Sequence, residues 1–585
     1  MKHILIFRFL LPMLILTLGL AAQAWADDAP KPPAPPLKIV YFTPSDCTPL
    51  DDRQERLGRV MKNVQDFYRD GMTANGYGPM TFNLEWETPD KLKLYMVKGK
   101  KKQLEYGRND ASVVRQEVRD ALLEQGINID REVIVIFQQL LNWDGDKATE
   151  IGPYVGGGSH LSGTGWVYED KLLDPDLLAS KEPGGYYHGP CSQGQFNTHY
   201  IGGTAHELGH GFSLPHDCEL AVENEKQGNS LMGSGNHTYG KNLRNEGRGT
   251  FLSASSALRL SKVRAFAGDL PRANDRGTMQ LEELTAEYKN GDIILTGRVK
   301  ADPPLAGMIA YNDNEAISSD YDAKSWVAPV DKNGNFRVTI TELIKTPYQL
   351  RLVGVHENGA SSRVAINYEV GDDGPDLSPI NAIIPNLHVL QLYQARDKIG
   401  LQKLVARLKT QRARNAASVD ETLFRKAQHA LKLLNAPTEF VSPADVPAKE
   451  KSFAVSQAKF SETRTGWGRI QRDQVPESVF LSVGGEFSES GLYAHAESLY
   501  KCDLGGKWST LKVGFGLQDG NGGSVVFVVR GDGKELFRSE LIRNRTLRQQ
   551  EIDVKNVKTL ELIVENGGDG NGSDWAVWAA PTLER

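Results

Sequence analysis

The sequence predicts a multidomain protein: an N-terminal α/β unit over residues 38–270, a central β-sandwich over 275–371, a helical connector over 384–436 and a C-terminal β-sandwich over 452–585. A chain of 585 residues is too long for a single hydrophobic core. Strand and helix patterns alternate through the first unit, as they do in parallel α/β sheets. Short strands separated by turn residues then follow, and one helical stretch interrupts them.

The N-terminus has the pattern of a secretory signal peptide over residues 1–26. Lys2 and Arg8 precede an apolar run from Phe9 to Ala22, and Ala24-Trp-Ala26 offers a small-residue cleavage site. An uncleaved anchor is the alternative, although the run is short for a membrane span. No second apolar stretch is long enough to cross a bilayer. We therefore expect a secreted or periplasmic protein with no transmembrane span after signal removal.

The first unit begins after a Pro-rich linker at residues 27–37. Apolar residues at helical spacing predict a helix over residues 51–70, and Ser112 can cap a second helix that Gly126 closes. Apolar or alternating runs predict strands at residues 37–42, 80–86, 92–97 and 133–137. A last helix from Ser253 would end the unit near residue 270.

Charge and cysteine content exclude some classes of protein. The formal net charge is −6, and losing the two basic residues of the signal leaves 66 basic against 74 acidic residues, or −8. A mildly acidic chain without a basic tract is a poor partner for nucleic acid. The four cysteines are too few for a disulfide scaffold. Cys191 and Cys218 could form a bridge, Cys47 could pair with either, and Cys502 is expected to be buried.

Residues 206–217 carry the strongest chemical signal in the chain. His206 and His210 are four positions apart, so a helix would place both imidazoles on one face. Two imidazoles on one face can bind one zinc ion, with Glu207 as a general base beside it. His216 follows after a turn and supplies a third nitrogen, which leaves a position open for water. The alternative is a helix with two unrelated surface histidines.

This stretch resembles the metzincin zinc endopeptidases, whose pattern is His-Glu-x-x-His-x-x-Gly-x-x-His. Asp217 after the third histidine is similar to the adamalysin-like branch, whereas Ser213 stands where the family has glycine. Metzincins also place a methionine in a tight turn beneath the metal, and Met232 between glycines matches it, unless it lies in an ordinary glycine loop. The resemblance implies a Zn²⁺ cofactor, zinc ligation by the three histidines and catalysis by Glu207.

A Gly-rich segment at residues 156–166 precedes the histidine motif. We interpret it as an edge segment above the cleft, where a substrate backbone could add as a strand; a flexible loop is the equal alternative. His160, His188 and His199 are not at ligand spacing, so we expect surface or loop positions for them.

The central region has no evident chemistry. Its strands are predicted at residues 293–299, 336–340, 348–353 and 363–368, with turn residues between them, which indicates a small immunoglobulin-like β-sandwich. A spacer is the default interpretation. Residues 386–434 carry a helical apolar stripe and predict a helical hairpin or connector.

The C-terminal region resembles the NPCBM domain, a carbohydrate-binding β-sandwich, over nearly its whole length. Its most specific feature is a Gly-rich acidic loop that ends at Asp574 and Trp575. An exposed tryptophan can stack on a sugar ring while a nearby carboxylate accepts hydroxyl hydrogen bonds. In the alternative reading, the tryptophan belongs to the core and Asp574 only orders the loop.

These features together predict a secreted zinc endopeptidase. Its substrate would be a protein or glycoprotein, and a polysaccharide or glycan bound by the C-terminal domain would direct it. The alternative from another class is a non-catalytic glycan-binding or surface scaffold protein with a relic protease fold. The complete set of three histidines and Glu207 argues against a relic, which has no need of the general base.

Overall fold

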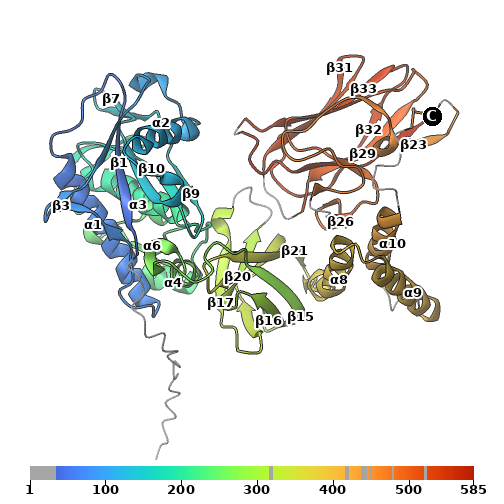
Figure 1. Cartoon of the computed structure of the whole chain (residues 1–585), viewed down its shortest axis with the longest axis horizontal. Helices are drawn as coiled ribbons and strands as arrows, with labels where there is room; N and C mark the ends of the chain where they lie inside the picture. The colour runs from blue at the N-terminus through green and yellow to red at the C-terminus, as the bar shows by residue number, and fades with distance from the viewer. Residues whose placement is uncertain are drawn as a thin grey trace, which may run out of the picture.

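The computed structural model describes residues 34–314, 320–415, 420–435, 444–447, 449–476, 480–519, 523–568 and 570–585. The expected signal peptide at residues 1–26 and most of the linker at 27–37 lie outside the described residues. In the described part of the chain, no helix has both the length and the apolar composition that crossing a membrane requires. Several β-rich units with helices follow one another along the chain (Figure 1), as the sequence predicted.

A mainly parallel sheet organises the N-terminal unit. Its strands are, in sheet order, β2 (Asn83–Leu84), β1 (Pro36–Thr43), β6 (Val133–Gln138), β10 (Gly163–Tyr168) and β9 (Val155–Gly158), with β5 (Tyr95–Lys98) also paired to β1. All of these pairs are parallel except that of β9 with β10. The predicted strands at 37–42 and 133–137 lie within β1 and β6, whose side chains are nearly all buried.

Three long helices pack against this sheet: α1 (Arg53–Ala74), α2 (Ala111–Leu123) and α3 (Gln193–Gly211). The apolar face of α1 recurs at helical spacing and is buried, as the sequence predicted for residues 51–70. In contrast, α3 is buried on almost every side and contacts both β9 and β10. One hydrophobic core unites the sheet with all three helices.

Two antiparallel sheets follow. One contains β15 (Thr278–Lys289), β16 (Asp292–Asp302) and β19 (Asn335–Ile340); the other contains β18 (Lys324–Ala328), β17 (Leu305–Asn314), β20 (Pro347–His356), β21 (Ser361–Gly371) and β22 (Gly374–Pro375). Residues of both sheets share a single hydrophobic core. The four strands expected from the sequence lie within β16, β19, β20 and β21, whereas β15, β17 and β18 were not anticipated.

The helical region contains α7 (Ser378–Asn381), α8 (Ile383–Gln394), α9 (Lys398–Arg414) and α10 (Glu421–Asn435). Three of these helices, α8, α9 and α10, form a small core that also includes Phe480 and Phe487 from the C-terminal region. The sequence predicted a helical hairpin or connector for this stretch. The structure has three longer helices there rather than the two of a hairpin.

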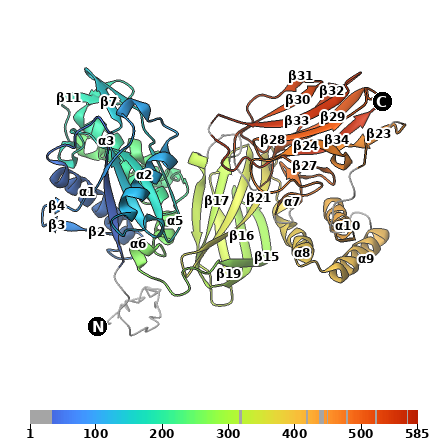
Figure 2. The ribbon, with the colours of Figure 1, turned by 45° about the horizontal axis from the view of Figure 1, so that its top comes forward.

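Two five-stranded antiparallel sheets make up the C-terminal region and share one core. The first contains β23 (Ser452–Ala454), β34 (Ala576–Glu584), β29 (Thr510–Leu517), β32 (Arg548–Asp553) and β27 (Gly491–Tyr493); the second contains β24 (Phe460–Arg464), β28 (Ser498–Asp503), β33 (Thr559–Asn566), β30 (Val525–Gly531) and β31 (Lys534–Arg538). In both views the central sheets lie between the N-terminal unit and the C-terminal sheets (Figure 2).

Candidate metal centre

Helix α3 holds the first two histidines of the motif. Ser192 caps the helix: its hydroxyl accepts the Gln195 N–H at 3.1 Å, and the Gln195 side chain accepts the Ser192 N–H at 3.1 Å. His206 and His210 follow near the C-terminal end, four residues apart and therefore on one side of the helix.

The structure brings the side chains of His206, His210 and His216 together. Each offers one ring nitrogen, and these nitrogens all lie within 4.8 Å of one another. The Nδ1 atoms of His206 and His210 lie 2.7 and 2.8 Å from the carbonyl oxygens of Leu231 and Leu214. A carbonyl only accepts, so these Nδ1 atoms carry the protons, and the Nε2 atoms are the nitrogens that could bind a metal ion. The Nε2 atoms of His210 and His216 are 3.0 Å apart.

Burial keeps the first imidazole neutral. His206 is 1% exposed, and the loss of solvation, together with neighbouring His210, lowers its pKa to about 3. Neutral imidazole is the form that binds a metal ion. Three ring nitrogens converging from one helix and the following turn match the donor set of a zinc site.

The turn between the second and third histidines has a left-handed residue. Ser213 has φ of 69°, a conformation that favours glycine, and it stands where the metzincin pattern has glycine. The Arg259 guanidinium donates to the Ser213 carbonyl at 2.9 Å and holds the turn. The chain therefore makes the sharp turn with serine in place of glycine, and His216 reaches the other two histidines.

Met232 lies directly beneath the zinc-motif helix. It is fully buried, and a Cβ added to Gly209 of α3 would lie 2.5 Å from its sulfur atom. The carbonyl of the preceding Leu231 accepts the proton of His206, and the Met232 carbonyl accepts the Asp217 N–H at 3.3 Å. This turn thus supports both the helix and the segment after His216.

Glu207 is buried beside the histidines, with 8% exposure. Burial raises its pKa to about 8, and a hydrogen bond from the Gly156 N–H opposes that shift. Gly156 belongs to β9, the last strand of its sheet within the described chain, and the segment is therefore an edge strand beside the histidines.

Glycines allow this edge to approach the helix closely. A Cβ on Gly156 would lie 1.9 Å from the Glu207 carbonyl oxygen, and Cβ atoms on Gly158 and Gly163 would lie 2.2 and 1.9 Å from the carbonyl oxygen of Gly211. No side chain fits at these positions, so the sheet packs backbone to backbone on α3.

A residue from the central sheets covers the third histidine. The ring of Tyr321 stacks on His216 with centroids 3.6 Å apart and an interplanar angle of 26°. The backbone of Cys218 pairs with this segment, because its N–H donates to the Ala323 carbonyl at 2.8 Å. No local sequence pattern links positions so far apart, and Tyr321 was not among the predicted site residues.

Asp217 joins the metal centre to the central sheets. It is 1% exposed, and burial raises its pKa while surrounding hydroxyls counteract the rise. Four serine hydroxyls donate to its carboxylate: Ser230 at 3.0 Å, Ser253 at 2.7 Å, Ser325 of β18 at 3.2 Å, and Ser255. The residue after His216 is thus a buried anchor between separate parts of the chain.

Histidine and tyrosine rings form a wall beside the motif. His199, expected at the surface or in a loop, is a buried residue of α3 that stacks on Tyr187 at 3.4 Å and lies 5.2 Å from the ring of His237. Burial lowers the pKa of His237 to about 4. The seven-residue spacing between His199 and His206 places both on one helix face and could have revealed this wall.

The cysteines and the tyrosine after the Met232 turn lie apart from the three histidines' ring nitrogens and form no disulfide. All four cysteines are free thiols, so neither the possible bridge between Cys191 and Cys218 nor a bridge with Cys47 is formed, and Cys502 is buried as expected. Cys218 instead lies beside β18, with its sulfur 3.2 Å from the Asp322 carbonyl oxygen. Tyr239 donates to Asn63 at 2.7 Å and is buried in the core rather than aimed at the histidines.

The two residues expected to bind carbohydrate lie in different environments. Asp574 is 1% exposed and accepts the Ser524 N–H at 2.8 Å, so its carboxylate orders the loop from inside. Trp575 is partly buried and packs 5.1 Å from Trp467, an indole that is 49% exposed. Trp467 was missed because it lies far from Trp575 in the sequence.

Comparisons with known proteins agree with these observations. Residues 451–584 match the model of the NPCBM/NEW2 domain. No curated protein matches the sequence. Wild-type OgpA from Akkermansia muciniphila is 24% identical, with a TM-score of 0.51, over 60% of this chain and 96% of its own. Its catalytically inactive form, solved with an O-glycopeptide substrate, is 23% identical over the same shares with a TM-score of 0.51.

A further solved structure is CBM51 from Clostridium perfringens GH95 in complex with methyl-galactose. It is 25% identical over 23% of this chain and 99% of its own, with a TM-score of 0.22. The chain therefore contains an NPCBM/NEW2 domain at its C-terminal end and shares the fold of OgpA over 60% of its length.

Proposed function

We propose that the chain is a zinc-dependent endopeptidase of the metzincin type that cleaves glycosylated proteins outside the cytoplasm. The observation that carries this proposal is the convergence of three histidine nitrogens within 4.8 Å beside the buried carboxyl group of Glu207. His206, His210 and His216 would hold the ion. A bound zinc ion would lower the pKa of a water molecule, so that the water can lose a proton and attack near neutral pH. It would also stabilise the negative charge that develops on the carbonyl oxygen of the cleaved bond.

Glu207 is the general base of the proposed reaction. Its carboxylate takes the proton of the attacking water and then delivers it to the leaving amine. Burial alone raises the pKa of this group to about 8, and the positive charge of a bound ion would lower it again. The Gly156 N–H fixes one carboxylate oxygen during both transfers.

The free edge of β9 would bind the substrate backbone. β9 is the last strand of its sheet in the described chain, and three of its four residues are glycines with no side chain in the way. An extended peptide can add to such an edge as a further strand through main-chain hydrogen bonds. This would place the bond to be cleaved next to Glu207, which β9 contacts through Gly156.

Glycosylated substrates are supported by two of the comparisons. OgpA, which shares the fold, was solved with an O-glycopeptide substrate, and the C-terminal region contains an NPCBM domain. In that domain, exposed Trp467 and neighbouring Trp575 would form the platform on which a sugar ring stacks. Trp575 therefore remains a proposed sugar-binding residue, whereas Asp574 is proposed to order the loop rather than to bind the sugar.

Cleavage of a matched substrate pair tests the proposal. Purified protein is incubated with an O-glycosylated peptide and with the same peptide lacking the glycan, and products are identified by mass spectrometry. We expect one zinc ion per chain by elemental analysis and cleavage that depends on the glycan. Glu207→Gln should keep the zinc and lose about a hundredfold or more of the activity, whereas exposed Glu225→Gln should change neither. Glycan binding without zinc or cleavage would instead establish the non-catalytic scaffold protein.

A further inference from the structure

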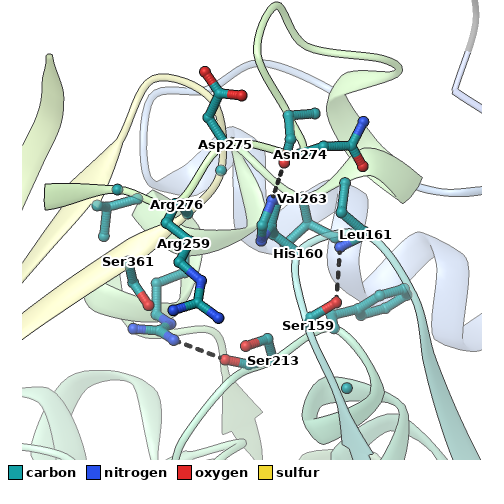
Figure 3. Close-up of a pocket in the computed structure, with 17 residues that line it drawn as sticks. Ser159, His160, Leu161, Ser213, Arg259, Val263, Asn274, Asp275, Arg276 and Ser361 are labelled. Atoms are coloured by element: carbon teal, nitrogen blue, oxygen red, sulfur yellow. Dashed lines mark hydrogen bonds between the residues drawn. The ribbon is translucent and has the colours of Figure 1, made fainter. Parts of the chain in front are cut away.

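A cavity of about 430 Å³ lies between the N-terminal unit and the central sheets (Figure 3). Its walls come from the loop after β9, the turn after α3, the helix α5 (Ala254–Leu260), the linker at residues 273–277 and the turn between β20 and β21. Its volume is within the range of small-molecule sites, and none of the predicted site residues lines it.

Two arginines point into this cavity. Arg259 and Arg276 both line it, together with Ser213 and Ser361 (Figure 3). Arg259 donates to the Ser213 carbonyl at 2.9 Å, and Arg276 is an exposed side chain. Neither arginine forms an ion pair with a carboxylate of the described chain.

Two carboxylates at or close to the cavity are paired with other basic residues. Asp275 points away from the two arginines (Figure 3), and its Oδ2 lies 2.7 Å from Nε of Arg272. Glu357, close to the turn that closes the cavity, pairs with Lys262 at 2.5 Å. Two positive side chains that line one cavity without an ion-pair partner make it electropositive, and a bound carboxylate would offset this charge. Guanidinium groups also provide the planar donors that suit carboxylates.

The cavity continues the proposed substrate path. Ser213 lies between His210 and His216 in sequence, and Ser159 directly follows β9. From Gly156, which contacts Glu207, three residues of extended chain to Ser159 span about 10 Å. A peptide paired with β9 would therefore bring a group two or three residues from the cleaved bond to the arginines.

We propose that this cavity binds a carboxylate of the substrate and makes the enzyme prefer acidic substrates. The proposal rests on the peptidase function proposed above. The carboxylate comes either from an acidic side chain of the peptide or from an acidic sugar of its glycan. His160 fixes the cavity by bonding from Nε2 to the Ala273 carbonyl at 2.8 Å, which ties the loop after β9 to the linker.

Three substrates test the proposal and distinguish the two sources: an O-glycopeptide with a neutral glycan, the same glycopeptide ending in an acidic sugar, and the neutral glycopeptide with Asp placed two or three residues from the cleaved bond. We expect kcat/KM for at least one acidic substrate to exceed the neutral value about tenfold, since a charged hydrogen bond at a partly exposed site contributes on that scale. High salt should reduce the preference.

Replacing the exposed arginine should abolish the discrimination. In Arg276→Gln the ratio of acidic to neutral kcat/KM should fall to about one, and Arg276→Lys should retain part of it. Arg248→Gln removes one positive charge from an exposed position outside the cavity and should preserve the ratio. An equal rate for all three substrates in the wild type, or an unchanged ratio in Arg276→Gln, would overturn the proposal.

A binding arm separates failure of the cavity from failure of the peptidase. Glu207→Gln protein should bind the preferred acidic glycopeptide about tenfold more tightly than the neutral one, and adding Arg276→Gln should remove the difference. If the protein binds the acidic glycopeptide preferentially but the wild type does not cleave it, the peptidase proposal is refuted and carboxylate binding in the cavity is supported. If the wild type cleaves glycopeptides but shows no preferential binding, the cavity proposal is refuted and the peptidase is supported.

Discussion

Adding one methyl group to Gly156 should separate the edge strand from the zinc-motif helix. A Cβ there would lie 1.9 Å from the Glu207 carbonyl oxygen and 2.8 Å from the His210 Cβ. Ordinary non-bonded contacts begin above 3 Å, so β9 and α3 must move apart by about 1 Å. The backbone oxygen belongs to a helix that is buried on almost every side and cannot give way alone.

The expected cost of Gly156→Ala follows from this overlap. Overpacking of a tight contact costs about 1–3 kcal/mol, and we expect the upper end because both contacts are with atoms of the buried helix α3, which cannot move aside on its own. For a unit of this size that corresponds to a fall of about 5–10 °C in Tm. The shift also moves the Gly156 N–H away from the Glu207 carboxylate, and a misplacement of about 1 Å near a reacting group lowers kcat/KM about a hundredfold.

Gly157→Ala is the matched control. It makes the same chemical change one residue along the strand, where no atom lies within 4 Å of the added Cβ. The Tm and the zinc content should be near wild type in this variant. The inference that these backbones touch would be refuted if Gly156→Ala kept the wild-type Tm and kcat/KM, or if both variants lowered Tm equally.

Two further predictions concern the buried carboxyl groups. In metal-free protein Glu207 holds a proton up to about pH 8 that the unfolded chain releases near pH 4.5. The free energy of unfolding should therefore fall as pH rises across that window, by at most about 1.4 kcal/mol per unit, and Glu207→Gln should show a smaller fall in urea titrations with chelator. Ser325→Ala removes a hydroxyl from Asp217 and should cost about 1–2 kcal/mol and weaken zinc binding in calorimetry. Thr285→Ala, at an exposed hydroxyl of β15, should change neither; equal effects would contradict the anchoring role of Asp217.

Sequence patterns that extend over only a few residues indicated several features of the candidate site. The four-residue spacing of His206 and His210 predicted their common helix face, and Met232 was anticipated from the glycines around it. The Gly-rich run also indicated the edge strand, because repeated glycine next to a strand signals close backbone approach.

Contacts between distant segments could not be read from the sequence. Tyr321 and Ser325 reach the metal centre through the pairing of β17 and β18, strands that the sequence pattern did not reveal. The cysteine pairing was left open for the same reason, since spacing says nothing about where two thiols lie in space, and the structure has four free thiols. His199 was expected at the surface or in a loop because it is not at ligand spacing. Its burial could not be read from an amphipathic pattern, since α3 is buried on nearly all sides.

The stacking of Tyr321 on His216 and the bond from Ser325 to Asp217 have a consequence for the timing of assembly. A chain leaves the ribosome from its N-terminus, so the motif helix emerges well before β18 does. The N-terminal unit must therefore wait for downstream residues before His216 is covered and Asp217 is anchored. A nascent or prematurely terminated chain that ends before this strand would carry the full zinc motif without its support, which links maturation of the centre to completion of the next domain.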